Sequence, residues 1–454
     1  MLFQSQTFLL AFLPVVLVAY FALARHLAAR EWVIILASAV FYGWWDARFL
    51  PLMLGQTLLT WLLARMLGPR SRWLLPLGVG ANLGVLALFK YADFAVESAE
   101  ALLGVALPRA GLILPIGISF YSFQLVSYLL DLRSGRAPLY GLRRFTAYVT
   151  FFPQLVAGPI VRHHELIPQF DLDPRRSGLA ERIGRGGALF ALGLAKKVFL
   201  ADALAPAADA AFAAAAIGAP PLGLAWSGVA GFGLQIFFDF AAYSEMAMGL
   251  ALIMGLALPL NFDRPYAARN LQEFWRRWHM TLSRFLRDYL YIPLGGSRHG
   301  HARTVAATLA TMGLCGLWHG AGWTFVLWGL LHGAGLLACR AWGALGRPLP
   351  FALAWALTLA FVLAAWAPFR APDLATAWHM LAGLAGAGGL GLGAGWPLIG
   401  VAAAIALLPQ AHARWVLEAM PPRPVFAAAA AAGVLLCLVA VGERPPAAFI
   451  YFQF

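Results

Sequence analysis

Charged residues are scarce in this chain of 454 residues. They make up 12% of it, against about 25% of an ordinary soluble domain. Hydrophobic residues make up 61%, and the mean hydropathy is +0.74. This composition excludes a soluble enzyme. Apolar stretches recur that are long enough to cross a hydrocarbon layer, which takes about 20 residues each, so we predict an all-α polytopic membrane protein.

Cysteine is also scarce. Cys315, Cys339 and Cys437 all have apolar neighbours and form no CxxC pair, which argues against a disulfide framework and a zinc site. The sequence contains no HExxH, no GxSxG and no phosphate-binding loop. We therefore expect no metal site and no bound cofactor, and we expect the acceptor to supply the nucleophile of any group transfer.

Positive charge exceeds negative charge, with a formal net charge of +13. Arginines cluster in short connections, in residues 69–72, 133–144 and 175–185, as in cytoplasmic loops that follow the positive-inside rule. This pattern explains the basic composition without nucleic-acid binding, for which no motif is present. The same rule places the N-terminus outside the cytoplasm, together with the acidic loop Ala92 to Arg109.

The apolar stretches predict about 11 to 13 transmembrane helices in one integral domain, residues 1–454. The candidate spans are Phe8 to Ala24, Trp32 to Trp45, Phe49 to Leu67, Trp73 to Tyr91, Leu112 to Leu132, Ala188 to Leu204, Leu222 to Phe240, Tyr243 to Leu260, Thr304 to Trp318, Trp323 to Cys339, Phe351 to Trp366, Trp396 to Leu408 and Val425 to Val441.

Two segments depart from this pattern. Phe145 to Val161 is apolar but contains Pro153 and Gly158-Pro159, which favours a re-entrant segment, because broken backbone at membrane depth must be buried in protein or line a cavity. Asn261 to Gly300 combines seven arginines with many aromatic residues, which favours a helix lying at the cytoplasmic interface. In that helix Glu273 can pair with Arg277 at i, i+4.

Three histidines stand out from the others, which fall in or near loops. His319 lies between two apolar spans, where burying an ionisable side chain is costly and indicates a function. An imidazole can accept and return a proton near neutral pH, as acyl transfer to a hydroxyl requires. The alternative is a structural histidine that bonds to a backbone carbonyl. For His332, on the next span, the structural role is the favoured interpretation. The role of His279 cannot be decided from its position alone.

Further polar groups interrupt the apolar pair of spans between residues 222 and 260. Asp239, Tyr243, Ser244 and Glu245 follow one another closely there. They either satisfy one another or line a polar tunnel.

These residues belong to longer motifs that resemble the membrane-bound O-acyltransferase (MBOAT) family, and within it the bacterial branch that serves alginate O-acetylation and teichoic-acid D-alanylation. The resemblance covers nearly the first 340 residues. The motifs that carry it are Met1 to Trp45, Leu114 to Gln124, Phe152 to Ile160, Phe237 to Met246, Asn261 to Tyr266, Glu273 to Gly296 and Gly316 to Gly333.

The resemblance implies a ring of helices around a central tunnel, with the acyl donor entering from one face and the acceptor from the other. Its Trp-His-Gly histidine, the essential catalytic residue of the family, matches His319, and its Arg-Arg-Trp-His histidine matches His279. The residues that we expect to line the tunnel are Asp239, Tyr243, Trp318, Trp323 and His332.

The C-terminal residues 443–454 form a predicted extracytoplasmic tail that ends in Phe-Ile-Tyr-Phe-Gln-Phe. Its aromatic side chains are typical of an interfacial anchor. The tail also resembles a terminal motif of envelope acylation systems, in which the tyrosine is proposed to carry the acyl group. Carried over, this makes Tyr451 the nucleophile, and a phenol with a pKa near 10 then needs a base such as His319.

The sequence therefore predicts a membrane O-acetyltransferase subunit in the bacterial cytoplasmic membrane, surrounded by membrane lipid. We expect acetyl-CoA or another cytoplasmic acyl thioester as donor and a cell-envelope or exported polysaccharide as acceptor. The family implies a separate extracytoplasmic partner of the SGNH type. The alternatives are a D-alanyl or lipid acyltransferase of the same family and, ranked lower for want of internal repeats, a transporter.

Overall fold

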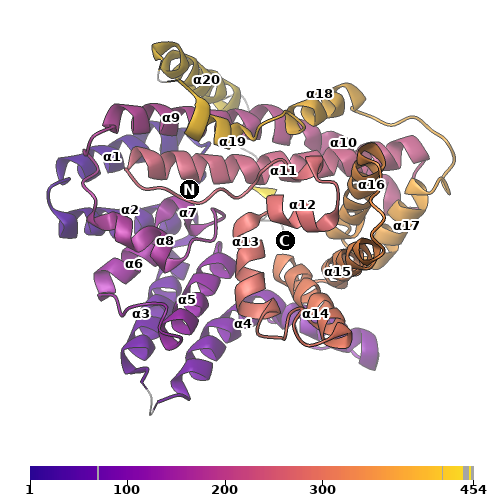
Figure 1. The fold of residues 1–454 in the computed structure, drawn as a ribbon, viewed down its shortest axis with the longest axis horizontal. Coiled ribbons are helices and arrows are strands. Elements are labelled where there is room, and N and C mark those ends of the chain that lie inside the picture. The colour runs from indigo at the N-terminus through magenta and orange to yellow at the C-terminus, as the bar shows by residue number, and fades with distance from the viewer. Residues whose placement is uncertain (69–70, 422, 443–448, 451–454) are drawn as a thin grey trace. The chain divides into compact units, whose positions relative to one another are not determined.

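A computed structural model describes residues 1–68, 71–421, 423–442 and 449–450 of the chain. This part of the protein consists of helices and their connections and contains no strand (Figure 1). The predicted all-α class is confirmed.

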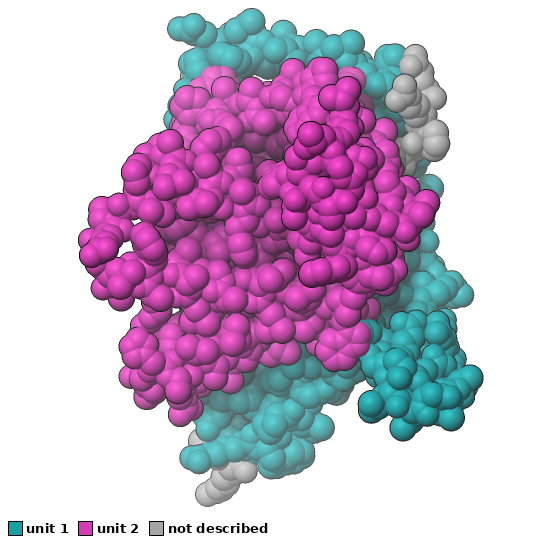
Figure 2. Space-filling view, turned by 90° about the vertical axis from the view of Figure 1, so that its right-hand side faces the viewer, with its two compact units in different colours: residues 1–194, 243–259, 416–448 teal, residues 195–242, 260–415, 449–454 magenta. Residues whose placement is uncertain are grey.

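The chain divides into two compact units (Figure 2). Unit 1 contains residues 1–194, 243–259 and 416–448, and unit 2 contains residues 195–242, 260–415 and 449–454. The helices of unit 1 are α1 (Leu13–Ala22), α2 (Leu27–Asp46), α3 (Leu50–Met66), α4 (Leu74–Leu103), α5 (Ile118–Arg133), α6 (Leu142–Thr150), α7 (Phe152–Leu155), α8 (His163–Leu166) and α20 (Pro424–Gly442).

The helices of unit 2 include the segments that carry the predicted histidines. They are α10 (Asp202–Ala215), α12 (Leu271–Arg277), α13 (Met280–Leu286), α14 (His301–His319), α15 (Trp323–Ala344), α16 (Phe351–Arg370), α17 (Leu374–Leu384), α18 (Trp396–Ala406) and α19 (His412–Arg414). Helices α9 (Leu179–Ala195) and α11 (Leu222–Ile253) contain residues of both units.

Six helical segments in the described residues are long and apolar enough to cross a membrane, which identifies a multi-pass membrane protein. They are Leu27–Met66, Leu74–Leu103, Leu222–Ile253, Trp323–Ala344, Phe351–Arg370 and Pro424–Gly442. Their surroundings differ: 89% of the apolar window of α11 is buried in protein, against 6% of that of α20. The exposed apolar surface of α20 suits contact with lipid tails, which do not penalise it as water does.

Helix α11 corrects the prediction of two separate spans, Leu222 to Phe240 and Tyr243 to Leu260. The structure forms a single helix from Leu222 to Ile253. The residues at the supposed break are Phe240, Ala241 and Ala242. None of them is a helix breaker such as glycine or proline, and alanine is the best helix former. The polar groups there do not mark a loop, because Asp239 is buried in an ion pair with Lys197.

Two other predicted boundaries are wrong. The segment Ala92 to Arg109 is not a loop, because α4 continues to Leu103 and ends at Gly104 with a positive φ of 69°. Its alanines and glutamates favour helix even though the segment is polar. The predicted span Ala188 to Leu204 lies inside a longer helical run, in which a π-helical segment at Lys196–Ala201 joins α9 to α10.

Candidate active site

Helices α14 and α15 of unit 2 form a hairpin that carries His319 and His332. A Cβ on Gly316 of α14 would overlap the carbonyl oxygen of Phe325, and one on Gly329 of α15 would overlap that of Met312. Glycine at these positions therefore lets the two backbones meet, as small residues do in membrane helix pairs. The close pairing fixes His319, the last residue of α14, beside the first turns of α15.

We expect Gly316→Ala to destabilise the protein, because the added methyl group has no room between two backbones. Overpacking of this kind costs about 1–3 kcal/mol, which a fall in the thermal unfolding midpoint of the purified protein would report. Gly343→Ala on α15 is the control, since a Cβ there meets nothing within 4 Å. If both variants unfold at the wild-type temperature, the backbones of α14 and α15 have room for a methyl group at Gly316, contrary to this prediction.

His319 is 2% exposed and is surrounded by rings of unit 2. Its ring centroid lies 4.9 Å from that of Trp318, 5.1 Å from Trp328 and 5.4 Å from Phe369. The ring of His279 lies 6.4 Å away. The predicted catalytic histidine therefore lies inside the protein, next to the second predicted histidine.

His279 occupies an unusual backbone conformation. The predicted interfacial helix of residues 261–300 is wrong as a single element, because α12 ends at Arg277 and α13 begins at Met280. Between them, His279 has φ 41° and ψ 54°, in the left-handed region that residues other than glycine seldom adopt. Asn261 stabilises this turn, since its carbonyl oxygen accepts the Met280 amide at 2.9 Å.

The side chain of Asn261 also determines which nitrogen of His279 carries the proton. Asn261 Oδ1 accepts the Thr281 amide at 3.2 Å and the Thr281 hydroxyl at 2.9 Å, so this atom is an acceptor. His279 Nδ1, at 3.2 Å from the same atom, must therefore donate. Burial lowers the pKa of His279 to about 3, so the ring is neutral at neutral pH. Its Nε2 then carries a lone pair and has no hydrogen-bond partner among the described residues.

His332 has the opposite arrangement. The indole Nε1 of Trp275, which can only donate, lies 3.3 Å from His332 Nδ1. The neutral ring therefore carries its proton on Nε2, a buried donor with no partner among the described residues. Unit 2 thus contains one buried imidazole that offers a lone pair and one that offers an N–H group.

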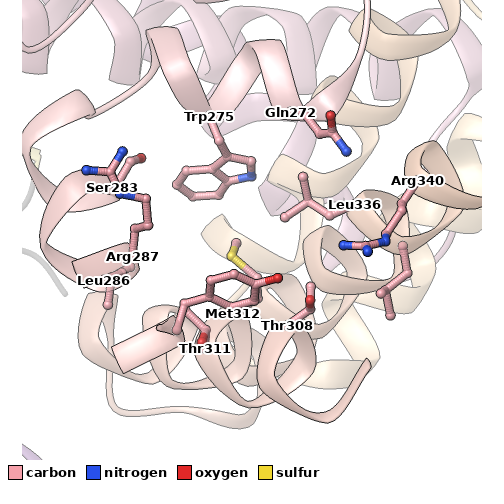
Figure 3. A pocket seen from close by; sticks show the side chains of 12 residues that line it. Gln272, Trp275, Ser283, Leu286, Arg287, Thr308, Thr311, Met312, Leu336 and Arg340 are labelled. Carbon is pink, nitrogen blue, oxygen red and sulfur yellow. The ribbon is translucent and has the colours of Figure 1, made fainter. Parts of the chain in front are cut away.

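A pocket of about 230 Å³ is lined in part by Trp275. Helices α12 to α15 and the π-helical segment Arg287–Tyr291 supply its lining, which consists of Gln272, Trp275, Ser283, Leu286, Arg287, Tyr291, Thr308, Thr311, Met312, Leu336, Leu337 and Arg340. Figure 3 shows the exposed arginines Arg287 and Arg340 on opposite sides of Trp275. The pocket therefore offers an apolar wall, several hydroxyl groups and two arginines, of which Arg287 also pairs with Asp288 at 2.7 Å.

A continuous series of ring contacts connects this pocket with His319. The Trp275 ring lies 5.4 Å from His332, the His332 ring 4.8 Å from Trp328, and the Trp328 ring 5.1 Å from His319. Trp275 lines the pocket, and two residues, His332 and Trp328, lie between it and the candidate base in this series.

Asp239 binds a cation and a backbone amide at once. Its Oδ1 lies 2.7 Å from Lys197 Nζ, and its Oδ2 accepts the Ile450 amide at 2.6 Å. Asp239 and Lys197 are both buried. The side chain that we predicted as a tunnel residue therefore bonds to Ile450, 211 positions further along the chain.

The structure places the remaining predicted residues in different surroundings. Trp318 is buried beside His319, whereas Trp323 at the start of α15 is 56% exposed. Tyr243 belongs to unit 1, where its ring stacks on Phe3 at 4.7 Å. Tyr451 lies outside the described residues. The tunnel roles of Tyr243 and Trp323 and the nucleophilic role of Tyr451 stay predictions.

Three residues of this site had no role predicted from the sequence: Asn261, Trp275 and Lys197. Lys197 had a usable signal, because a lysine inside a predicted apolar span indicates a buried partner or a function. Asn261 and Trp275 lie in motifs that carry the family resemblance, but their contacts with histidines 18 and 57 positions away have no local signature.

One group in the described residues has the composition of a metal site. Asp131, His163 and His164 of unit 1 offer ligand atoms within 4.8 Å of one another. Asp131 already pairs with Arg136 at 2.9 Å, and His163 bonds Asp131 through Nε2 and Tyr140 through Nδ1. A polar network between α5 and α8 accounts for the cluster.

Comparison with known proteins gives a family match over residues 88–368, to MBOAT, the membrane-bound O-acyltransferase family. The matched range contains the candidate histidines and the pocket.

Individual relatives cover more of the chain. It is 42% identical to the probable alginate O-acetylase AlgI of Pseudomonas putida, over 84% of this chain and 79% of that protein. It is 38% identical to the peptidoglycan O-acetyltransferase of Helicobacter pylori, over 86% and 81% of the two chains. The teichoic acid D-alanyltransferase of Streptococcus thermophilus is 30% identical over 50% of this chain and 57% of its own.

Proposed function

Because this chain belongs to the membrane-bound O-acyltransferase family, we propose that it moves acetyl groups from a cytoplasmic thioester to the acceptor side of a bacterial cytoplasmic membrane. The acetyl groups then O-acetylate a cell-envelope or exported polysaccharide. The names of relatives that act on alginate and peptidoglycan support this class of acceptor. The family shows that the protein is an O-acyltransferase. That the transferred acyl group is acetyl is our proposal.

One observation carries the proposal: a series of ring contacts connects a buried group of histidines with a pocket suited to a thioester. His319 and His279 lie within one ring contact of each other. Trp275 contacts His332 and also lines the pocket. The apolar wall of the pocket suits the chain that bears the thioester, and its two arginines suit phosphate groups.

In the first step, the Tyr451 hydroxyl attacks the thioester carbonyl carbon while His319 accepts the phenolic proton. A C–O bond forms, the C–S bond breaks, and the proton on His319 passes to the leaving thiolate. The base is needed because a phenol is a weak nucleophile at neutral pH. His332, with its proton on Nε2, is suited to stabilise the oxyanion that develops in this step.

In the second step, an acceptor hydroxyl attacks the aryl ester, and Tyr451 leaves as phenolate and takes up the proton that the acceptor releases. We assign this acceptor to an extracytoplasmic partner of the SGNH type, which then passes the acetyl group to the polysaccharide. His279 has an open Nε2 lone pair beside His319, which suits it to orient a hydroxyl. No bound cofactor is needed in either step, and acetyl-CoA is a substrate.

The proposal is tested by incubating the purified full-length protein with radiolabelled acetyl-CoA in the absence of a partner. We expect rapid release of coenzyme A and label on about one site per chain, the burst that a covalent intermediate gives. A D-alanyl carrier protein is the parallel donor. Labelling from that donor but not from acetyl-CoA would make the protein a D-alanyltransferase instead.

We expect Arg340→Ala to weaken donor binding more than catalysis. The side chain lies at the pocket, away from the histidines, so its loss raises the KM for acetyl-CoA about tenfold with little change in kcat, as expected when uniform binding is removed. Arg347→Ala, an exposed arginine just beyond α15, is the matched control. An unchanged KM for Arg340→Ala would place the phosphates of the donor elsewhere.

A further inference from the structure

The contact between Asp239 and the C-terminal tail joins two distant parts of the sequence. Asp239 lies in α11, and Ile450 follows it by 211 positions. The two atoms are 2.6 Å apart and buried. A hydrogen bond from an amide to an ionised carboxylate is shorter and stronger than one between neutral groups.

Lys197 makes this carboxylate possible inside the protein. Its Nζ lies 2.7 Å from Asp239 and 2.8 Å from Asp202. A buried carboxylate without a cation would be strongly disfavoured. Lys197 belongs to the π-helical segment Lys196–Ala201, and such segments occur often at functional sites.

The two oxygens of Asp239 each serve one donor. An asparagine could not do the same, because its amide has one oxygen and one NH₂ group, so one of its two contacts would bring donor against donor. The aspartate is therefore matched to two simultaneous donors, a lysine ammonium and a backbone amide.

Ring contacts place Phe449 close to the candidate active site. The ring of Phe449 lies 5.7 Å from that of Phe240, the residue after Asp239. The ring of Phe240 also contacts that of His279, at 4.6 Å. Phe449 and His279 therefore share one aromatic neighbour.

We propose that Asp239 and Lys197 form a clamp that holds the chain by the Ile450 amide, one residue before Tyr451, the residue that the proposed acyl transfer requires at the histidines. In this proposal Asp239 and Lys197 are positioning residues, not catalytic residues. The proposal rests on the function of Tyr451 proposed above, but the clamp itself can be measured without any acyl transfer.

The test is amide hydrogen exchange of the full-length protein, followed by mass spectrometry of the C-terminal peptide. In the wild-type protein the Ile450 amide exchanges slowly. In Asp239→Asn we expect exchange at Ile450 to accelerate at least about tenfold, because a charge-assisted hydrogen bond is lost. Exchange in peptides of α14 stays at the wild-type rate, which shows that the fold is intact.

Two further variants make the result specific. Asp209→Asn removes an exposed carboxylate of unit 2 that pairs with Arg370, and we expect wild-type exchange at Ile450. The double variant Asp239→Asn with Lys197→Met frees the asparagine oxygen from the ammonium group, so it can accept the Ile450 amide again. We expect this variant to recover much of the protection.

Equal exchange at Ile450 in the wild type and in Asp239→Asn overturns the clamp, whatever the role of Tyr451. If Asp239→Asn releases the tail, we also expect kcat for acetyl transfer to fall while the KM for acetyl-CoA stays constant, because the donor pocket is untouched. Released tails with an unchanged kcat would refute the positioning role. Tyr451→Phe leaves the clamp intact, so its exchange at Ile450 remains slow even where acetylation is lost.

Discussion

Replacement of His319 by alanine is expected to reduce acetyl transfer by about 10²–10⁴-fold, the usual contribution of a positioned general base. The imidazole is buried and within ring contact of His279 and Trp328. No water can easily replace it among these rings, so the phenol would keep its proton. The measurement is the rate of coenzyme A release from acetyl-CoA, together with polysaccharide acetylation in cells.

His301→Ala is the matched control, because His301 is the exposed first residue of the same helix. We expect it to retain wild-type activity and wild-type stability. The KM for acetyl-CoA should change little in His319→Ala, since the pocket is lined by other residues. Residual activity of His319→Ala within a few fold of the wild type would assign the proton transfer to another group.

The second large effect is expected for Tyr451→Phe. The change removes one oxygen atom and keeps the aromatic ring, so it separates a carrier from an interfacial anchor. A carrier loses acetyl transfer completely, whereas an anchor loses almost nothing. The measurement is polysaccharide acetylation in cells, supported by mass spectrometry of the C-terminal peptide, where an acetyl adduct on Tyr451 is expected in the wild type and in no other peptide.

Tyr91→Phe on α4 provides the same chemical change in a different part of the protein, and we expect it to be active. Full acetylation by Tyr451→Phe contradicts the carrier role while leaving the family and the role of His319 in place. Trapping the adduct is easier in the absence of the partner, because nothing then removes the acetyl group.

Local patterns in the sequence determined the class of the protein and selected His319 as the candidate base. The scarcity of charge and the apolar stretches are sufficient for a polytopic helical protein, because each span must satisfy its own backbone in lipid. His319 was identified from its Trp-His-Gly setting and from the cost of placing an ionisable side chain between two spans. The pairing of Glu273 with Arg277, at 2.6 Å, also followed from helical spacing.

Helix boundaries were predicted less well, for reasons visible in single residues. Residues 222–260 were predicted as two spans, with Asp239 and other polar side chains beside the break. The structure forms one helix from Leu222 to Ile253, and Lys197 neutralises the Asp239 carboxylate. At residue 279 the error is the reverse: a helical pattern continues through the position, but Asn261 holds His279 in a left-handed turn.

What only the tertiary structure decided is how distant residues meet. The proton positions of His279 and His332 depend on Asn261 and Trp275, and the Ile450 amide meets the carboxylate of Asp239. Composition and periodicity are properties of neighbouring residues, so they specify helices and the faces they bury. A hydrogen bond between residues 211 positions apart has no local signature, because it forms only after packing has brought the two chain segments together.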